Sequence, residues 1–225
     1  MEGWESGMND REGNRRGAHR RDFILLALAS CAAMPSKAAP APVVLVLGDS
    51  MSAEYGLARG SGWVALLQER LADQKMAATV INASVSGDTT AGGRSRLQAL
   101  LQKHQPALVV IELGGNDALR GLPLQGTEDN LARMVQQAQA ARAKVLLVGM
   151  QVPPNYGTDY ARRFAALFET IAKAHEAALV PFLLAGVADG PEPLRLFQAD
   201  RIHPNARAQP LMMENVWKVL APMLR

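Results

Sequence analysis

The sequence predicts one α/β domain of three layers, in which a parallel β-sheet lies between two layers of helices. Three observations predict it. Five short apolar runs, rich in branched residues and bounded by turn residues, alternate with longer segments whose apolar residues recur at helical spacing. A repeated strand–helix order implies right-handed crossovers between parallel strands. The length of 225 residues suits one such domain and gives no strong indication of a second.

The predicted strands and helices follow one another along the whole body of the chain. The strand segments are continuously apolar, which is typical of strands buried on both faces of a parallel sheet. The predicted strands span residues 43–47, 79–82, 107–113, 144–150 and 179–183. The predicted helices span residues 62–73, 90–104, 128–142, 159–177 and about 206–223. We therefore expect a three-layer α/β/α sandwich with a five-stranded parallel, flavodoxin-like sheet.

Residues 1–42 are predicted to be an export signal and a short linker, followed by one globular domain at 43–225. Residues 14–21 carry four arginines and no acid, residues 23–34 are apolar, and residues 35–42 are rich in alanine and proline. The apolar run is too short to span a bilayer permanently. The mature chain is therefore predicted to be periplasmic or secreted.

Two motifs in this leader bear on how the chain is exported. Residues 20–25 resemble the twin-arginine signal, which implies export of a folded protein. Residues 28–31 resemble a bacterial lipoprotein box, in which Cys31 would be acylated and would tether the chain to a membrane. We expect ordinary cleavage between Ala29 and Ala41, with Cys31 incidental. As the single cysteine, Cys31 forms no intramolecular disulfide.

The composition argues against several classes of protein. Hydrophobic residues make up 48% and charged residues 20%, so neither a disordered chain nor a polytopic membrane protein is expected. The net charge is +3, but basic and acidic residues interleave along most of the chain. No stripe of basic and aromatic residues occurs. We expect no nucleic acid partner and no stable protein partner.

Polar clusters follow the first three predicted strands. They lie at residues 48–50 (Gly-Asp-Ser), 84–89 and 114–117 (Gly-Gly-Asn-Asp). In a doubly wound parallel sheet, ligands bind beyond the carboxyl ends of the strands, where the strand order reverses. We therefore expect a functional site at this edge of the sheet.

One serine, one histidine and one aspartate are candidates for nucleophilic catalysis. A serine hydroxyl needs a base that takes its proton and a third group that orients the base. Asp200 and His203 are spaced so that a turn before a helix can direct the carboxylate at Nδ1 while Nε2 faces Ser50. Taken alone, Ser50 is typical of a turn, and the pair is equally typical of a helix cap beside a surface histidine, or of two metal ligands. No third cluster supports a metal.

Three groups are candidate donors to the oxyanion of a tetrahedral intermediate. They are the backbone N–H groups of Ser50 and Gly87 and the side-chain amide of Asn116. Loss of one such donor typically costs about 3 kcal/mol of transition-state stabilisation. Gly87 lacks a Cβ, so its backbone is expected to approach the substrate closely. Asn116 can donate with no charge to desolvate.

The acids and histidines nearby are assigned other roles. Asp49 is adjacent to Ser50, so its side chain is expected to point elsewhere and to hold the loop. Asp117 is expected to cap the segment that follows it. His104 and His175 lie in predicted helices and are not site candidates. The glycines at 114 and 115 fit neither a dinucleotide fingerprint nor a P-loop, so no nucleotide cofactor is expected.

These clusters, in this order, resemble the four blocks of the SGNH, or GDSL, hydrolase family. The matching residues are 48–50, Gly87, 114–117, and Asp200 with His203. Longer stretches resemble the bacterial branch of thioesterase I, lysophospholipase and arylesterase; they lie at residues 82–89, 112–117, 154–157 and 202–205. The resemblance covers residue 43 to the end of the chain. Four ordered blocks are far more specific than one tripeptide, and they favour a catalytic role for Ser50.

The resemblance implies roles for these residues and a class of substrate. It makes Ser50 the nucleophile, His203 the general base and Asp200 the residue that orients the base, with the three oxyanion donors named above. It implies no metal ion and no organic cofactor. Acyl-thioesters, lysophospholipids and small aryl esters are the substrates of close relatives. Met51 departs from the leucine usual in the family, and we expect changed packing there rather than lost activity.

Four residues are candidates for the wall of an acyl pocket. The leucine-rich loop 118–125 follows the oxyanion block, and in the resembling family the equivalent segment moves on ligand binding. We expect Leu119 and Leu122 to contact the acyl tail, and Pro154 and Tyr156 to form another wall. The structural alternative is an apolar loop packed on the core.

The predicted function is hydrolysis of small-molecule or lipid acyl esters and thioesters through an acyl-enzyme on Ser50. A carbohydrate O-deacetylase is an alternative that the apolar loop disfavours. A lipid-binding protein without activity is another, and it predicts a missing catalytic residue, whereas none is missing. An exported protein meets lysophospholipids or external esters more readily than cytosolic acyl-CoA. The sequence does not determine acyl length, ester or thioester preference, or oligomeric state.

Overall fold

The computed structural model describes residues 40–152 and 154–224, which belong to one compact unit, Ala39–Arg225. Most of the predicted export segment, including the twin-arginine-like stretch and Cys31, lies outside the described residues. Within the described part of the chain, no helix is long and apolar enough to cross a membrane. The prediction of an exported leader therefore stays a prediction.

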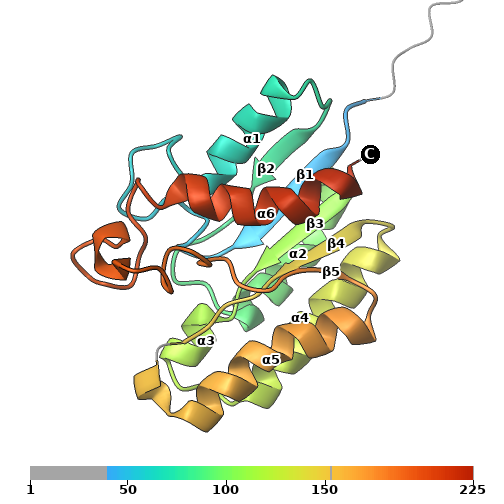
Figure 1. Cartoon of the computed structure of the whole chain (residues 1–225). Coiled ribbons are helices and arrows are strands. Elements are labelled where there is room, and N and C mark those ends of the chain that lie inside the picture. Colours follow the sequence, from blue (N-terminus) through green and yellow to red (C-terminus); the bar gives the residue numbers. More distant parts are fainter. Residues whose placement is uncertain (1–39, 153, 225) are drawn as a thin grey trace, which may run out of the picture. The chain divides into compact units, whose positions relative to one another are not determined.

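The centre of the unit is one parallel sheet of five strands, as the sequence predicts (Figure 1). The strands are β1 (Val43–Gly48), β2 (Thr79–Asn82), β3 (Leu108–Glu112), β4 (Lys144–Val148) and β5 (Ala178–Val180). They pair in parallel in the order β2-β1-β3-β4-β5. The order reverses at β1, because the chain passes first to β2 on one side of it and then to β3 on the other. This reversal is where a doubly wound sheet opens a crevice.

Helices cover both faces of this sheet. Helices α1 (Trp63–Asp73) and α6 (Gln209–Met223) pack together on one face. Helices α2 (Thr90–His104), α4 (Leu124–Ala140) and α5 (Thr158–Ala174) lie side by side on the other (Figure 1). The predicted three-layer α/β/α sandwich is therefore confirmed.

The two edge strands differ from their prediction. The strands β1, β3 and β4 are buried almost throughout, but β2 and β5 are largely half-buried or exposed, because each has a neighbour on one side only. The strand predicted at 179–183 ends at Val180, before Pro181, which has no N–H to donate to a ladder. Leu183 remains fully buried, but in a turn rather than in a strand. Leu183 is apolar because it packs in the core, and not because it belongs to a strand.

Several short or shifted helices were not predicted. Helix α3 (Gly115–Leu119) and the 3₁₀ turns η1 (Pro154–Tyr156) and η2 (Pro193–Leu196) are new. Helix α4 begins four residues earlier than expected, after Pro123, whose φ of −58° and ψ of 128° lead into the helix. The loop predicted at 118–125 therefore shortens to residues 120–123 between α3 and α4.

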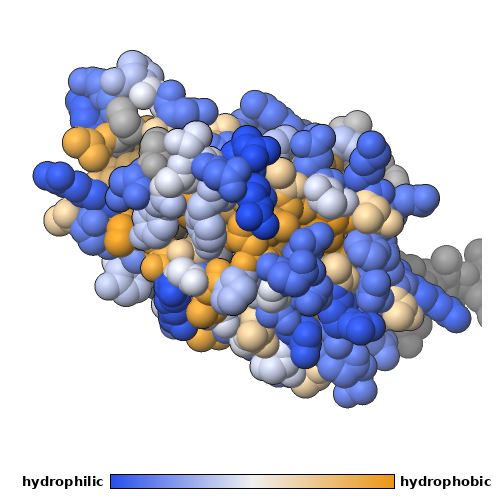
Figure 2. Space-filling view, turned by 90° about the horizontal axis from the view of Figure 1, so that it is seen from below, coloured by the Kyte–Doolittle hydropathy of each residue, from blue (hydrophilic) through white to orange (hydrophobic). Residues whose placement is uncertain are grey.

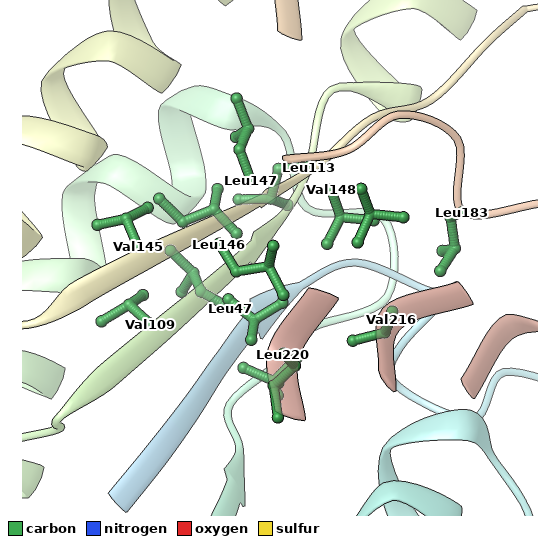
Figure 3. Packing of buried hydrophobic residues seen from close by; sticks show 14 of the residues in the cluster. Leu47, Val109, Leu113, Val145, Leu146, Leu147, Val148, Leu183, Val216 and Leu220 are labelled. Atoms are coloured by element: carbon green, nitrogen blue, oxygen red, sulfur yellow. The ribbon is translucent and has the colours of Figure 1, made fainter. Parts of the chain in front are cut away.

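A continuous hydrophobic core fixes the sheet between the helices. Figure 3 shows side chains of this core, among them Leu47 of β1, Val109 of β3 and Leu146 of β4, with Val216 and Leu220 of α6. These five side chains are all fully buried. Because β1 and β3 are held in register, Gly48 lies opposite Glu112, and the polar segments that follow both strands emerge at the same edge.

Candidate active site

Ser50 lies just beyond the carboxyl end of β1, in a tight turn. The carbonyl of Asp49 accepts hydrogen bonds from the backbone N–H groups of Ser52 at 3.2 Å and Ala53 at 2.9 Å. Gly48 precedes the turn, and a Cβ there would lie 2.8 Å from both Glu112 Oε2 and Ser52 Oγ. Only glycine therefore allows the turn to pass this close to β3.

The structure brings Ser50, His203 and Asp200 together in one line. Ser50 Oγ lies 2.9 Å from Nε2 of His203, and Nδ1 of the same ring lies 2.6 Å from Asp200 Oδ2. These contacts place one ring nitrogen at the hydroxyl and the other at a carboxylate. In this tautomer Nδ1 donates to Asp200 and Nε2 can accept the serine proton. The arrangement can therefore deliver a nucleophilic alkoxide.

The segment that holds Asp200 and His203 is irregular and lies before α6. Asp200 Oδ1 accepts hydrogen bonds from the backbone N–H groups of Ile202 and His203, both at 3.0 Å. Arg201, between Asp200 and Ile202, has a left-handed φ of 59°. The expected helix start at about residue 206 is wrong, because α6 begins at Gln209. The aspartate thus shapes a loop of its own rather than a turn directly joined to the helix.

These hydrogen bonds keep Asp200 ionised. Its pKa falls from the ordinary 3.8 to about 2, mainly because the backbone N–H of His203 donates to the carboxylate, against a smaller opposing effect of burial. The Asp200 side chain is 36% exposed and that of His203 18% exposed, so this half of the site lies near solvent. At neutral pH the carboxylate can stabilise an imidazolium.

Sequence reasoning missed two residues that surround the histidine. The Tyr55 ring packs on His203 with centroids 4.4 Å apart and a tilt of 38°. Gln198 Nε2 donates to the carbonyls of Tyr55 at 2.8 Å and Pro204 at 3.1 Å, which ties the turn after Ser50 to the histidine segment. No local pattern marks either residue, because both contacts join segments about 140 residues apart.

The three candidate oxyanion donors lie on the segments that follow β1, β2 and β3. Gly87 has a left-handed φ of 79°, and a Cβ added there would have one near neighbour among the described residues, Arg120 Nη2 at 3.8 Å. Its backbone angle, rather than crowding, is what requires glycine. Arg120, which sequence reasoning also missed, donates from Nη2 to the Gly87 carbonyl at 2.8 Å. Among the hydrogen bonds of the described residues, none uses the N–H of Ser50 or Gly87.

Asn116 lies in the first turn of α3 and contacts the acid beside the nucleophile. Its Nδ2 donates to Asp49 Oδ2 at 2.9 Å, and Asp49 Oδ1 accepts the Met51 N–H at 3.0 Å. Asp49 therefore does hold the loop, as expected, but it also reaches a second segment of the site.

Asp117 does not cap the segment that follows it, as expected, but binds a residue that precedes it in the sequence. This buried carboxylate accepts from the backbone N–H of Thr90 at 2.9 Å and from its hydroxyl at 2.5 Å, so it serves the first residue of α2. Thr127 of α4 adds a longer contact at 3.5 Å. Asp117 thus joins three helices, which only the packing of α2 beside α4 makes possible.

Two buried acids lie beneath the serine turn. Glu112 is fully buried; its Oε2 accepts from Ser52 Oγ at 2.7 Å and from the Asp49 N–H at 3.4 Å. Burial, reinforced by the charge of Asp49, raises the pKa of Glu112 well above its ordinary value. Burial also raises the pKa of Asp49 from 3.8 to about 6, against the lowering effect of its hydrogen bonds from Met51 and Asn116. Burial thus disfavours the ionised form of both acids, and more strongly for fully buried Glu112.

The acyl-pocket candidates lie at the surface. Leu119, Leu122 and Tyr156 are all exposed. Leu122 also lines a cavity of about 600 Å³ between the α3–α4 loop and α5, whose described lining includes Tyr160 and Leu167 but not Ser50 or His203. The side chain of Pro154 lies outside what the structure describes. Figure 2, which looks at the unit from below Figure 1, shows hydrophobic surface between hydrophilic side chains.

Metal ligands are not gathered anywhere in the described part of the chain. No group of three or more histidine, cysteine, aspartate or glutamate side chains there could hold an ion. The two ring nitrogens of His203 lie against Asp200 and Ser50.

Comparisons with known proteins find one matching family and several similar proteins. The model of the GDSL-like lipase/acylhydrolase family matches residues 46–210. The chain is 52% identical over 201 residues to esterase TesA of Pseudomonas aeruginosa, covering 88% of this chain and 98% of the relative. It is 42% identical over 188 residues to thioesterase 1/protease 1/lysophospholipase L1 of Escherichia coli, covering 84% and 88%.

A solved structure shares the fold as well as the sequence. The crystal structure of TesA superimposes with a TM-score of 0.77 at 53% identity, covering 80% of this chain and 99% of that one. Residues 46–210, which the family model matches, include Ser50, Gly87, Asn116, Asp200 and His203.

Proposed function

This chain belongs to the GDSL-like lipase/acylhydrolase family, and from that premise we propose that it hydrolyses acyl esters and thioesters through an acyl-enzyme on Ser50. The observation that carries the proposal is the unbroken line of contacts from Asp200 through His203 to Ser50, at 2.6 and 2.9 Å. Relatives over most of the chain are named as an esterase and as a thioesterase and lysophospholipase.

The first half-reaction forms the acyl-enzyme. Nε2 of His203 takes the proton of Ser50 as Oγ forms a bond to the acyl carbon, and the carbonyl electrons move onto the oxyanion. The N–H groups of Ser50 and Gly87 and the amide of Asn116 stabilise that charge. Asp200 stabilises the imidazolium. When the carbonyl re-forms, the bond to the leaving alcohol or thiol breaks, and His203 returns the proton to it.

The second half-reaction releases the acid. Nε2 of His203 takes a proton from water as the water oxygen attacks the acyl carbon. The same three donors bind the second oxyanion. The bond to Ser50 Oγ then breaks, and the proton on His203 passes to Oγ, which restores the enzyme. Atoms and charge balance without any metal or organic cofactor in the scheme.

We propose lipid acyl esters, such as lysophospholipids, as the substrate class. Exposed Leu119 and Leu122, on the segment after the oxyanion donor Asn116, and exposed Tyr156 of η1 offer apolar contacts for an acyl chain. Leu122→Ser should flatten the dependence of kcat/KM on acyl length between butyryl and palmitoyl esters. Leu211→Ser, a change at an equally exposed leucine on α6, should leave that dependence unchanged. An unchanged profile in Leu122→Ser contradicts the assignment.

We propose that the chain is exported, because residues 1–42 carry a basic, an apolar and an Ala/Pro segment in that order. Fractionation of a bacterial host that expresses the full chain, with N-terminal sequencing of the mature form, tests this. Recovery of the uncleaved chain in the cytoplasm overturns it. Palmitate labelling that is lost in Cys31→Ala would show a lipid tether instead of a free enzyme.

The mechanism is tested by hydrolysis of p-nitrophenyl esters from acetyl to palmitoyl and of palmitoyl-CoA, with wild type and Ser50→Ala. We expect turnover of esters and thioesters by wild type and a loss of three or more orders of magnitude in the variant, on the order of 10³–10⁶. Activity confined to acetyl esters of sugars would favour a carbohydrate O-deacetylase. Binding of fatty acid with no turnover of any ester would favour a lipid-binding protein.

A further inference from the structure

Asp49 is a buried acid next to the nucleophile that has no step in the reaction above. It is 2% exposed, and both of its carboxylate oxygens are used. Oδ1 accepts the Met51 N–H at 3.0 Å, which closes the turn after the nucleophile. Oδ2 accepts from Asn116 Nδ2 at 2.9 Å, across 67 residues of sequence. One carboxylate thus joins the nucleophile turn to the side chain expected to bind the oxyanion.

The hydrogen bond to Asp49 fixes how Asn116 can donate. A primary amide carries two N–H donors on one nitrogen. One of them points at Asp49, so the plane of the amide and the direction of the second N–H are set. Hydrogen bonds to an ionised acceptor are roughly twice as strong as neutral ones, and burial strengthens them further. Without this bond, the amide is free to rotate, and an oxyanion donor loses its preorganisation.

The surroundings of Asp49 hold its backbone in place. Glu112, on β3, accepts the Asp49 N–H at its Oε2, at 3.4 Å. The Trp63 indole donates to Ser52 Oγ at 3.2 Å, and Ser52 donates to the same Glu112 oxygen at 2.7 Å. This buried chain anchors the backbone on both sides of Ser50, so the carboxylate of Asp49 has little freedom to move.

We propose that Asp49 is a positioning residue that orients the amide of Asn116 as an oxyanion donor, and that it acts on the reaction only through Asn116. The inference rests on the proposed function, because it presumes that Asn116 binds the oxyanion. It predicts an effect on kcat rather than on KM, since the oxyanion exists in the transition state and not in the bound substrate.

A double-mutant cycle tests the proposal with the full chain and p-nitrophenyl butyrate. Asn116→Ala should lower kcat by about 10²–10³-fold. Asp49→Asn should lower kcat by at least about tenfold with KM within about twofold, because asparagine offers one acceptor oxygen where aspartate offers two. In the Asn116→Ala background, Asp49→Asn should have no further effect on kcat. Asp73→Asn, the same change at an exposed position at the end of α1, is the matched control and should leave kcat unchanged.

Two outcomes overturn the proposal. One is a wild-type kcat in Asp49→Asn. The other is an equal fall in kcat whether Asn116 is present or not, which would assign Asp49 a role independent of the amide. Ser50→Ala separates these results from failure of the proposed function. If Ser50→Ala is inactive while the cycle is additive, the hydrolase mechanism stands and only the positioning role fails.

A second variant guards against a loss of folding. Asp49→Ser keeps an oxygen that can accept the Met51 N–H in a serine turn, but it is too short to reach Asn116. It should retain a cooperative thermal transition and show the same fall in kcat as Asp49→Asn. If neither variant folds, Asp49 acts through the fold as a whole, and the proposal is overturned.

Discussion

The two halves of the candidate site are held in different ways. Ser50, Gly87 and Asn116 follow the ends of β1, β2 and β3, and buried Asp49 and Glu112 lie beneath the nucleophile turn. Asp200 and His203 lie on an irregular, more exposed segment that is shaped by hydrogen bonds from its own backbone. The half that holds the nucleophile and the oxyanion donors is fixed by the sheet, and the half that holds the base is fixed by local contacts.

The two aspartates of the site express this difference in opposite pKa shifts. Burial raises the pKa of Asp49 to about 6, whereas backbone donors lower that of Asp200 to about 2. The ionised form of Asp49 therefore destabilises the folded state, whereas the ionised form of Asp200 stabilises it. Each of the following changes affects one half of the site or the hydrogen bonds that join the two halves.

The largest effect is expected from Asp200→Asn, which breaks the half that holds the base. The variant keeps an oxygen for the backbone N–H groups of Ile202 and His203, but its amide would face Nδ1 of the ring and favour the wrong tautomer. We expect kcat to fall about 10³–10⁴-fold. Steady-state kinetics with p-nitrophenyl butyrate check this, and a fall of less than tenfold would contradict an orienting role.

A smaller loss is expected from Gly87→Ala in the oxyanion half. Its φ of 79° strains any residue with a Cβ, so we expect about 1–2 kcal/mol of lost stability. Displacement of the Gly87 N–H should also lower kcat at least about tenfold. Gly186→Ala is the matched control, since its φ is 76° with open space around a Cβ. It should lower the Tm similarly and leave kcat unchanged; an equal loss of kcat in both variants would argue for a global effect.

A still smaller effect is expected from Gln198→Ala, which removes the side-chain hydrogen bonds that join the two halves of the site. The side chain donates to the Tyr55 carbonyl at an exposed contact and to the Pro204 carbonyl at a part-buried one, and its loss removes both hydrogen bonds. We expect the free energy of unfolding to fall by about 1–2 kcal/mol. The kcat/KM should fall by about tenfold or less, because His203 loses part of its support. Urea unfolding measures the change in stability, and steady-state kinetics on the same samples measure kcat/KM. An unchanged kcat/KM would show that the segment with Asp200 and His203 keeps its conformation without Gln198.

The smallest effects concern how the Tm depends on pH, and this dependence has opposite signs for Asp200 and Asp49. Asp200 has a folded pKa of about 2 against 3.8, so it contributes stability above pH 3.8 that is lost as the pH falls toward 2. The Tm advantage of wild type over Asp200→Asn should therefore shrink between about pH 5 and about pH 2. Scanning calorimetry of both proteins tests this, and a constant difference would contradict it.

Asp49 should behave in the reverse way. Its folded pKa of about 6 lies above 3.8, so the native state binds more protons in this window and loses stability as the pH rises through it. The Tm of Asp49→Asn relative to wild type should therefore rise between about pH 4 and pH 7. A relative Tm that falls over that range would mean that Asp49 is not buried as a charge.

The sequence by itself determined the sheet and the blocks of the site. Continuous apolar runs predict β1, β3 and β4, because a strand buried on both faces needs apolar side chains on both of them. Helix α2 was predicted at its observed bounds. Ser50, Gly87, Asn116, Asp200 and His203 could be chosen because each needs a particular chemistry next to a predicted strand end or helix start, and their order resembles one family.

Only the tertiary structure decided which side chains meet. The contact of Asn116 with Asp49, the bond of Asp117 to Thr90, and the packing of Tyr55 on His203 join segments that are 67, 27 and 148 residues apart. Nothing local to any of these residues encodes its partner. The raised pKa of Glu112 likewise follows from its complete burial beside Asp49. Sequence pattern sets the elements and their reactive groups, whereas distance, burial and dielectric environment exist only once the elements pack.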